Sequence, residues 1–165
     1  MATKTKPAPR FELNVTDVFE QVREAENAID LKEIITGLMH TCGPAVTVRV
    51  MKQCGRQCVH DQTVARAKAF YAKADNLEEF VTMLNAAGIG GRDLHVRQGA
   101  IVAVFKTCSC NLSRKAQGVC ALYCYSLAGW YEELFSRVFN RPVNARLLSS
   151  IIGGAERCEF EIQFQ

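Results

Sequence analysis

The eight cysteines of this 165-residue chain are the side chains whose type and spacing could do chemistry. Zinc takes four sulfur or nitrogen ligands, often supplied as two close pairs from separate segments. Two cysteines four residues apart on a helix share one face, and a Cys-x-Cys pair on a loop can also hold one ion. Zinc is therefore a candidate cofactor, and the candidate metal ligands are Cys54, Cys58, Cys108, Cys110, Cys124 and Cys158.

Three other uses of these thiols stay open. Nearby cations such as Lys52, Arg56 and Lys106 lower the pKa of a thiol, which favours thiol-redox chemistry. A cysteine nucleophile would need a base, and His60 is the histidine nearest to a cysteine pair. Free cysteines are also among the most often buried residues, so several can simply pack in the core.

Four aromatic residues with polar tips lie near Gly129 in the sequence: Tyr123, Tyr125, Trp130 and Tyr131. Such residues line pockets in which an apolar wall carries a few hydrogen-bonding groups. Tyr123, Tyr125 and Trp130 are the candidate ligand-binding residues, and the expected ligand is small and apolar. Gly129 would let its helix approach a neighbouring helix or a second subunit closely.

Helical spacing of apolar residues dominates the first half of the chain. It predicts helices over residues 15–29, from Asp30, over 65–73 and from Asp75, with a break at Gly43-Pro44. The valines at 46, 48 and 50 would also suit a strand. Recurrence of apolar residues and cysteines every four positions from Val46 to Cys58 favours a helix instead.

The period changes in the second half. Residues 94–96 and 100–107 flank a turn at 97–99 and predict a hairpin, followed by a loop over 108–118 and a long helix over 119–139. A strand of about eight residues is expected from Val143. After a turn at Gly153-Gly154, a final strand alternates apolar and polar residues from Cys158. We therefore expect an α+β fold: N-terminal helices, then an antiparallel sheet with the long helix packed on one face.

Composition narrows the class of protein. A net charge of +3 is too small and too scattered to indicate a nucleic-acid partner. No apolar run approaches the ~18–20 residues of a membrane-spanning helix, and the first residues do not resemble a secretory signal. We expect a cytoplasmic protein with a flexible tail over residues 1–12 and a single domain over 13–165.

Three segments of the C-terminal half carry a family resemblance. They are Tyr123-Cys124-Tyr125-Ser126-Leu127-Ala128-Gly129-Trp130, Arg141-Pro142-Val143-Asn144-Ala145 and the stretch from Gly153 to Ile162. Over about the last 60 residues the chain resembles the 4-vinyl reductase domain family, which shares its fold with ligand-binding domains of nitric-oxide-signalling and Golgi-transport proteins. Together with Cys54-Gly55-Arg56-Gln57-Cys58 and Cys108-Ser109-Cys110, they are similar to a cysteine-rich bacterial branch of that superfamily, near the amino-thiazoline-carboxylate hydrolase-like proteins.

The resemblance implies a homodimer with an interior pocket for a small hydrophobic molecule, beside which sensor members hold zinc with cysteines and a glutamate. Cys124 and Cys158 match two of those cysteines. The segment where the glutamate and a further cysteine would fall reads Arg146-Leu147-Leu148-Ser149-Ser150, so the other cysteine pairs would have to complete the set.

The function expected from the sequence is thus a sensor-like, small-molecule-binding domain with a cysteine-rich, zinc-binding site. The alternative is an enzyme, either a hydrolase of a small cyclic thioimidate or a thiol-redox protein, with Cys108 or Cys110 as the nucleophile. A third reading is a module that serves only for dimerisation.

Overall fold

The computed structural model describes residues 28–108 and 121–164. The predicted tail over 1–12, the predicted loop from 109 onward and nearly all of the first predicted helix lie outside these ranges. The described helices are α2 (Ala28–Gln57), α3 (Asp61–Tyr71), α4 (Leu77–Ala87), the 3-10 helix η1 (Ala121–Cys124) and α6 (Tyr125–Phe139). The described strands are β1 (Leu94–Arg97), β2 (Ala100–Phe105), β3 (Val143–Ser149) and β4 (Cys158–Phe164). The expected α+β fold class is confirmed.

Helix α2 consists of two helical halves that meet at Gly43. This residue has φ 77° and ψ 170°, a non-helical conformation that glycine adopts without a steric penalty. Pro44 begins the second half, where the missing N–H costs no helical hydrogen bond. The hydroxyl of Thr47 donates to the Gly43 carbonyl at 3.0 Å. The predicted break is confirmed, and so is a helix rather than a strand over residues 46–50.

The ends of α4 match local capping signals in the sequence, whereas α3 begins earlier than predicted. Asn76 caps α4 by accepting a hydrogen bond from the Glu79 amide at 2.9 Å, and Gly88 ends it in a left-handed conformation. Helix α3 begins at Asp61 rather than Ala65, so the predicted start was too late.

The strands form one antiparallel sheet in the order β1-β2-β4-β3. The last strand, β4, therefore lies between β2 and β3, with Phe160 opposite both Ala103 and Leu147. Phe160 and Ile162 on one face of β4 join Ile101 and Ala103 in the buried core. The predicted alternation along the last strand is thus confirmed.

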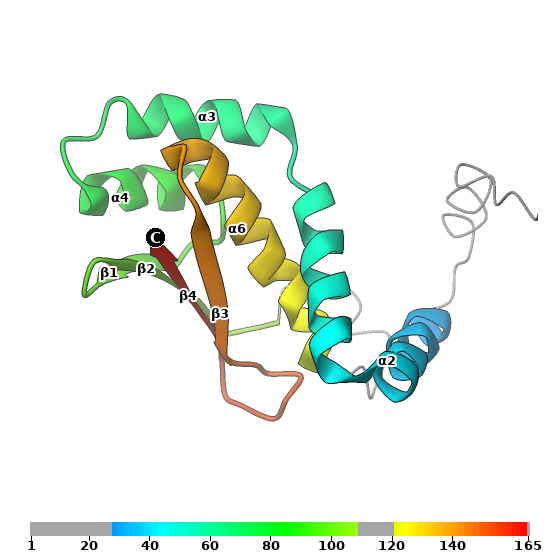
Figure 1. Cartoon of the computed structure of the whole chain (residues 1–165). Coiled ribbons are helices and arrows are strands. Elements are labelled where there is room, and N and C mark those ends of the chain that lie inside the picture. The colour runs from blue at the N-terminus through cyan, green and yellow to red at the C-terminus, as the bar shows by residue number, and fades with distance from the viewer. Residues whose placement is uncertain (1–27, 109–120, 165) are drawn as a thin grey trace, which may run out of the picture.

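Helix α6 lies between the sheet and α2 (Figure 1). Its residues Tyr131, Leu134 and Phe135 are fully buried. The prediction of one helix over 119–139 was wrong at its start, because a 3-10 turn precedes α6 and the α-helix begins only at Tyr125. No described helix is long and apolar enough to cross a membrane.

Side chains form hydrogen bonds with backbone groups at both edges of the sheet. At the β1 edge, the Asn85 carboxamide donates to the Leu94 carbonyl at 2.7 Å and accepts from the Leu94 amide at 2.8 Å. At the β3 edge, the Glu132 carboxylate accepts from the Ala145 amide at 3.1 Å and the Lys52 ammonium donates to the Ala145 carbonyl at 3.0 Å. These contacts tie α4 to one edge and both α2 and α6 to the other, and they blunt edges that could pair with another chain.

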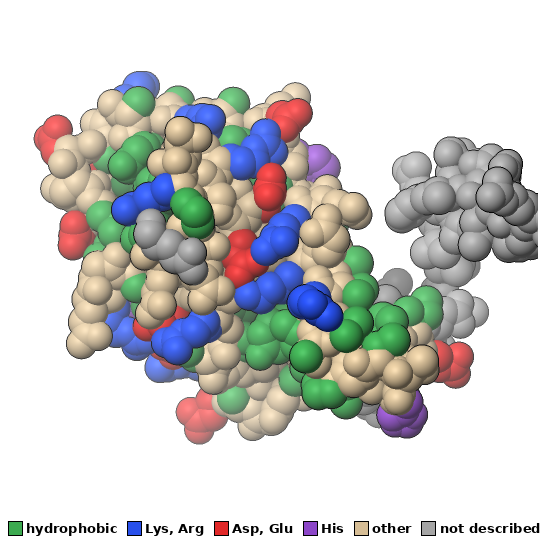
Figure 2. All heavy atoms as spheres, viewed as in Figure 1, with side chains coloured by type: hydrophobic (Ala, Val, Ile, Leu, Met, Phe, Trp, Pro, Cys, Tyr) green, Lys and Arg blue, Asp and Glu red, His purple; other side chains and the backbone are tan. Residues whose placement is uncertain are grey.

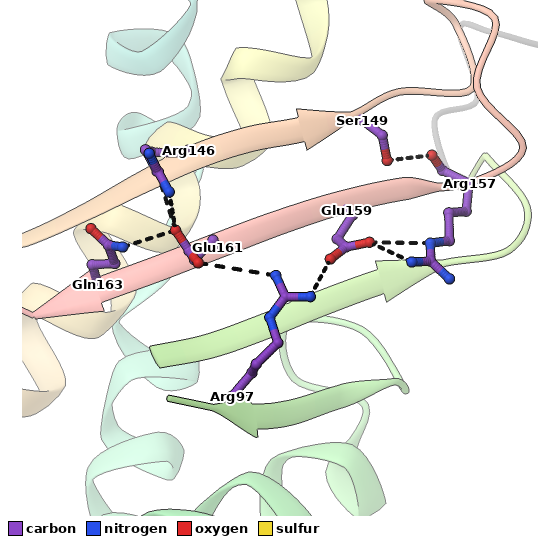
Figure 3. Close-up of polar contacts among 7 residues, drawn as sticks. All are labelled: Arg97, Arg146, Ser149, Arg157, Glu159, Glu161 and Gln163. Carbon is purple, nitrogen blue, oxygen red and sulfur yellow. Dashed lines mark hydrogen bonds and ion pairs between the residues drawn. The ribbon is translucent and has the colours of Figure 1, made fainter. Parts of the chain in front are cut away.

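The outer face of the sheet carries a charged network (Figure 3). Arg97 of β1 pairs with Glu159 at 3.0 Å, and Arg157 pairs with the same carboxylate at 2.8 Å. Arg146 of β3 pairs with Glu161. Burial alone would raise the pKa of Glu159, but hydrogen bonds from Arg157 and Arg97 hold it below its ordinary value. This face of the sheet is therefore lined by paired charges, and none of the helices within residues 28–108 and 121–164 packs on it.

Candidate functional site: an apolar pocket and a cysteine cluster

Helices α2 and α6 cross in direct backbone contact. A Cβ atom added to Gly55 of α2 would lie 1.7 Å from the Ser126 carbonyl oxygen, and one added to Gly129 of α6 would lie 1.9 Å from the Lys52 carbonyl oxygen. Each helix thus supplies a glycine where the other helix's backbone passes. The expectation that Gly129 permits a close approach is confirmed, and the neighbour is α2.

A pocket of about 570 Å³ opens beside this crossing. Its wall comes from the end of α2, the loop after α4, the end of β2, and the segment formed by η1 and α6. The lining residues are Met51, Cys54, Gly55, Cys58, Gly90, Gly91, Phe105, Tyr123, Ser126, Leu127 and Trp130. The volume falls within the range of about 300–1,000 Å³ that is usual for small-molecule sites.

The described lining residues include no charged side chain. Lys52 and Arg56 lie on the same part of α2, but both cations bind Glu132 of α6, at 2.5 Å and 2.7 Å. Figure 2 shows acidic and basic side chains side by side where α2, α6 and β3 meet. The wall therefore consists of apolar and aromatic groups, thiols and hydroxyls, which suits an uncharged ligand.

The Glu132 carboxylate of α6 accepts hydrogen bonds from Lys52 and Arg56 of α2 and from the Ala145 amide of β3. Its side chain is only 6% exposed. Burial alone would raise its pKa, but hydrogen bonds from Lys52, the Ala145 amide and Arg56 lower that pKa below the ordinary value. Glu132 is thus held as a carboxylate that joins α2, α6 and β3.

Tyr131 secures another part of the pocket wall. Its hydroxyl donates to the Gly90 carbonyl at 2.5 Å, and Gly90 lines the pocket. Complete burial raises the pKa of this phenol, so the hydroxyl keeps its proton. The ring also packs against Trp130 with centroids 5.5 Å apart.

Two of the three predicted ligand-binding residues, Tyr123 and Trp130, line the pocket. Tyr125 does not line the pocket; like Tyr123 it packs against the small cluster of Ile35 and Met51, and it also packs against the main core. Helix α2 forms one wall of this pocket, opposite residues of α6 and the end of β2. Sequence reasoning missed Gly55, Phe105 and Leu127; the glycines at 55 and 129, one in each helix, were the available signal.

Two of the predicted metal ligands, Cys124 and Cys158, meet at Ser150, and a third, Cys108, lies beside Cys158. The Cys124 thiol lies 3.1 Å from the Ser150 hydroxyl, and the Cys158 thiol interacts with both Ser150 and Cys108. The Ile151 amide donates to the Cys158 sulfur at 3.3 Å. Burial is the main cause that raises the pKa of Cys158, which keeps this thiol protonated near neutral pH.

The other predicted ligands lie elsewhere. Cys54 and Cys58 line the pocket, and Cys110 lies outside the described residues. Within residues 28–108 and 121–164, no three Cys, His, Asp or Glu side chains are grouped so that they could hold a metal ion. The described thiols therefore do not fit a zinc site on their own, and zinc binding stays a prediction.

By its fold and its site, the protein is an α+β domain with an apolar pocket where two helices cross. The chain belongs to a family of unknown function, DUF6144, whose model matches residues 14–165. No curated protein matches the chain.

Proposed function

We propose that this protein binds a small, neutral and largely apolar molecule in the pocket between α2, α6 and the end of β2. The observation that carries the proposal is the pocket itself: a volume of about 570 Å³ whose described lining is apolar, aromatic or uncharged polar. Burying apolar ligand surface against such a wall is favourable by roughly 25 cal/mol per Å².

The lining also offers a few polar groups for orientation. Ser126 and Trp130 carry an O–H and an N–H donor, and the sulfur atoms of the lining cysteines are weak acceptors. A ligand with one or two uncharged polar atoms would match this wall, whereas a carboxylate or ammonium would be desolvated without a counter-charge. The cytoplasmic location, the homodimer and a sensor role are further predictions and rest on the thiol content and the family resemblance.

Fluorescence provides a direct test, because Trp130 is the chain's one tryptophan and lies in the pocket wall. We expect the neutral probe N-phenyl-1-naphthylamine to bind the full chain with saturation and to quench Trp130. Leu127→Arg, which places a charge in the wall, should weaken binding at least about tenfold, or about 1.4 kcal/mol.

The matched control is Leu148→Arg, because Leu148 is exposed on β3 and does not line the pocket. This variant should bind the probe as the wild type does. Equal affinity of wild type and Leu127→Arg, with both folded by circular dichroism, would disprove the proposal, as would the absence of saturable binding to wild type.

A further inference from the structure

Two thiols lie on one wall of the pocket. Cys54 is in the last turn of α2, Cys58 follows just after the helix ends, and both side chains are exposed. In contrast, Cys124 and Cys158 at Ser150 are only 4% and 6% exposed. Cys54 and Cys58 are therefore accessible thiol residues that line an apolar binding space.

The cations nearest to these thiols do not enter the pocket wall. Lys52 and Arg56 bind Glu132, so the described groups facing Cys54 and Cys58 across the pocket are uncharged. A molecule held there would meet a soft sulfur nucleophile on one side and, from Ser126 and Trp130, uncharged hydrogen-bond donors on the other. Binding in the pocket holds the molecule beside the thiol and so raises the effective concentration of the two reactants.

We propose that the pocket captures apolar α,β-unsaturated carbonyl compounds covalently through Cys54 or Cys58. This inference rests on the proposed function and names the class of ligand. The thiolate sulfur forms a bond to the β-carbon as the carbon–carbon π bond breaks, and its electron pair moves to the carbonyl oxygen. The resulting enolate takes a proton from solvent at the α-carbon, replacing the proton that the thiol lost. The product is a thioether, and nothing leaves.

The chain contains its own control for thiol reactivity. Cys42 is exposed on the first half of α2 and does not line the pocket. Trypsin, which cleaves after Lys and Arg, separates the three thiols: Cys42 falls in the peptide 33–49, Cys54 in 53–56 and Cys58 in 57–66. Mass spectrometry of the reduced full chain can therefore compare their modification in one reaction.

The probes are 4-phenylbut-3-en-2-one, which carries a phenyl group, and the small polar acceptor acrylamide. We expect the modification ratio of Cys54 or Cys58 to Cys42 to be at least about tenfold higher for the phenyl compound. Leu127→Arg should abolish this gain without changing the labelling of Cys42. Cys54→Ser and Cys58→Ser, measured separately, should assign the gain to one thiol.

The outcomes separate this inference from the proposed function. If N-phenyl-1-naphthylamine binds but the ratio is the same for both probes, covalent capture is wrong and the proposed function stands. If the probe does not bind and the ratio is also unchanged, both are wrong. A higher ratio that persists in Leu127→Arg would reflect activation of the thiol outside the pocket and would also overturn the inference.

Discussion

Gly55 of α2 contacts the Ser126 carbonyl of α6 so closely that a Cβ on Gly55 would lie 1.7 Å from the oxygen. Both residues line the pocket. Because the opposing atom is backbone and cannot rotate away, the separation of the two helices and the shape of the pocket depend on the missing side chain.

Gly55→Ala should therefore push α2 away from α6. We expect the free energy of unfolding to fall by about 3 kcal/mol, as for other overpacked sites, when measured by urea denaturation. Gly37→Ala is the matched control, since Gly37 lies in the same helix and a Cβ atom added there would have nothing within 4 Å. That variant should gain up to about 1 kcal/mol from helix propensity, and equal stability of the two variants would contradict the close contact.

Glu132→Gln should remove the charge that Lys52 and Arg56 share. We expect a loss of about 3 kcal/mol in unfolding free energy at pH 7, because the largely buried Lys52 and the more exposed Arg56 lose the buried carboxylate that they share. Since the folded pKa of Glu132 lies below 4.5, its stabilisation is present above that pH and is lost as the pH falls through the folded pKa.

Acid titration of stability tests the same residue. Below about pH 5 the wild type should lose stability more steeply than Glu132→Gln, so the two curves should converge. Glu133→Gln is the control, because Glu133 is partly exposed and lies 3.9 Å from Arg137. It should cost less than about 0.5 kcal/mol. Parallel curves for wild type and Glu132→Gln would rule out the assigned role.

Asn85→Ala should free the backbone groups of Leu94 at the sheet edge. Losing both hydrogen bonds should cost about 1–3 kcal/mol and accelerate hydrogen exchange of the Leu94 amide. Glu78→Ala, at an exposed position of the same helix, should change neither quantity measurably. Unchanged exchange at Leu94 in Asn85→Ala would show that the carboxamide does not protect this edge.

Tyr131→Phe should leave the Gly90 carbonyl without its phenol donor. We expect about 1–2 kcal/mol of destabilisation and weaker binding of N-phenyl-1-naphthylamine, since Gly90 belongs to the pocket wall. The control is Tyr71→Phe, whose side chain is 46% exposed and lies outside the pocket. Equal affinity of both variants for N-phenyl-1-naphthylamine would contradict a role of the Tyr131 hydroxyl in shaping the pocket.

The zinc hypothesis predicts about one zinc per chain in protein purified under reducing conditions, and a loss of stability with chelator. Cys158→Ser should lower the zinc content, whereas Cys42→Ser should not, because Cys42 is exposed and distant in sequence from Ser150. Elemental analysis measures this directly. Metal-free protein that is folded and unaffected by chelator would contradict the hypothesis.

Most of the fold was predictable because its signals are local. The Asn76 cap, the Gly88 terminus, the break at Gly43-Pro44 and the alternation after Cys158 each depend on a few neighbouring residues. The start of α6 was predicted wrongly because apolar spacing alone does not distinguish a 3-10 turn from the first turn of an α-helix.

The site was predictable only in part. Tyr123 and Trp130 were identified from their chemistry, and they line the pocket. Tyr125 packs with Tyr123 against Ile35 and Met51 but does not line the pocket, because residue type and spacing do not determine which neighbouring segment a side chain meets. The six cysteines taken as candidate metal ligands are divided in the structure, since Cys54 and Cys58 border the pocket while Cys124 and Cys158 meet at Ser150 with Cys108 beside Cys158.

The order of residues along the chain thus encodes the fold class, most helix and strand positions and the chemical groups available, since periodicity and capping act over a few residues. It does not encode which distant segments meet. The pocket draws its wall from four segments, and Lys52 finds Glu132 eighty residues away. Those partnerships follow from packing two glycine-bearing helices against one sheet, where side-chain volume and backbone contact, rather than local propensity, select the neighbours.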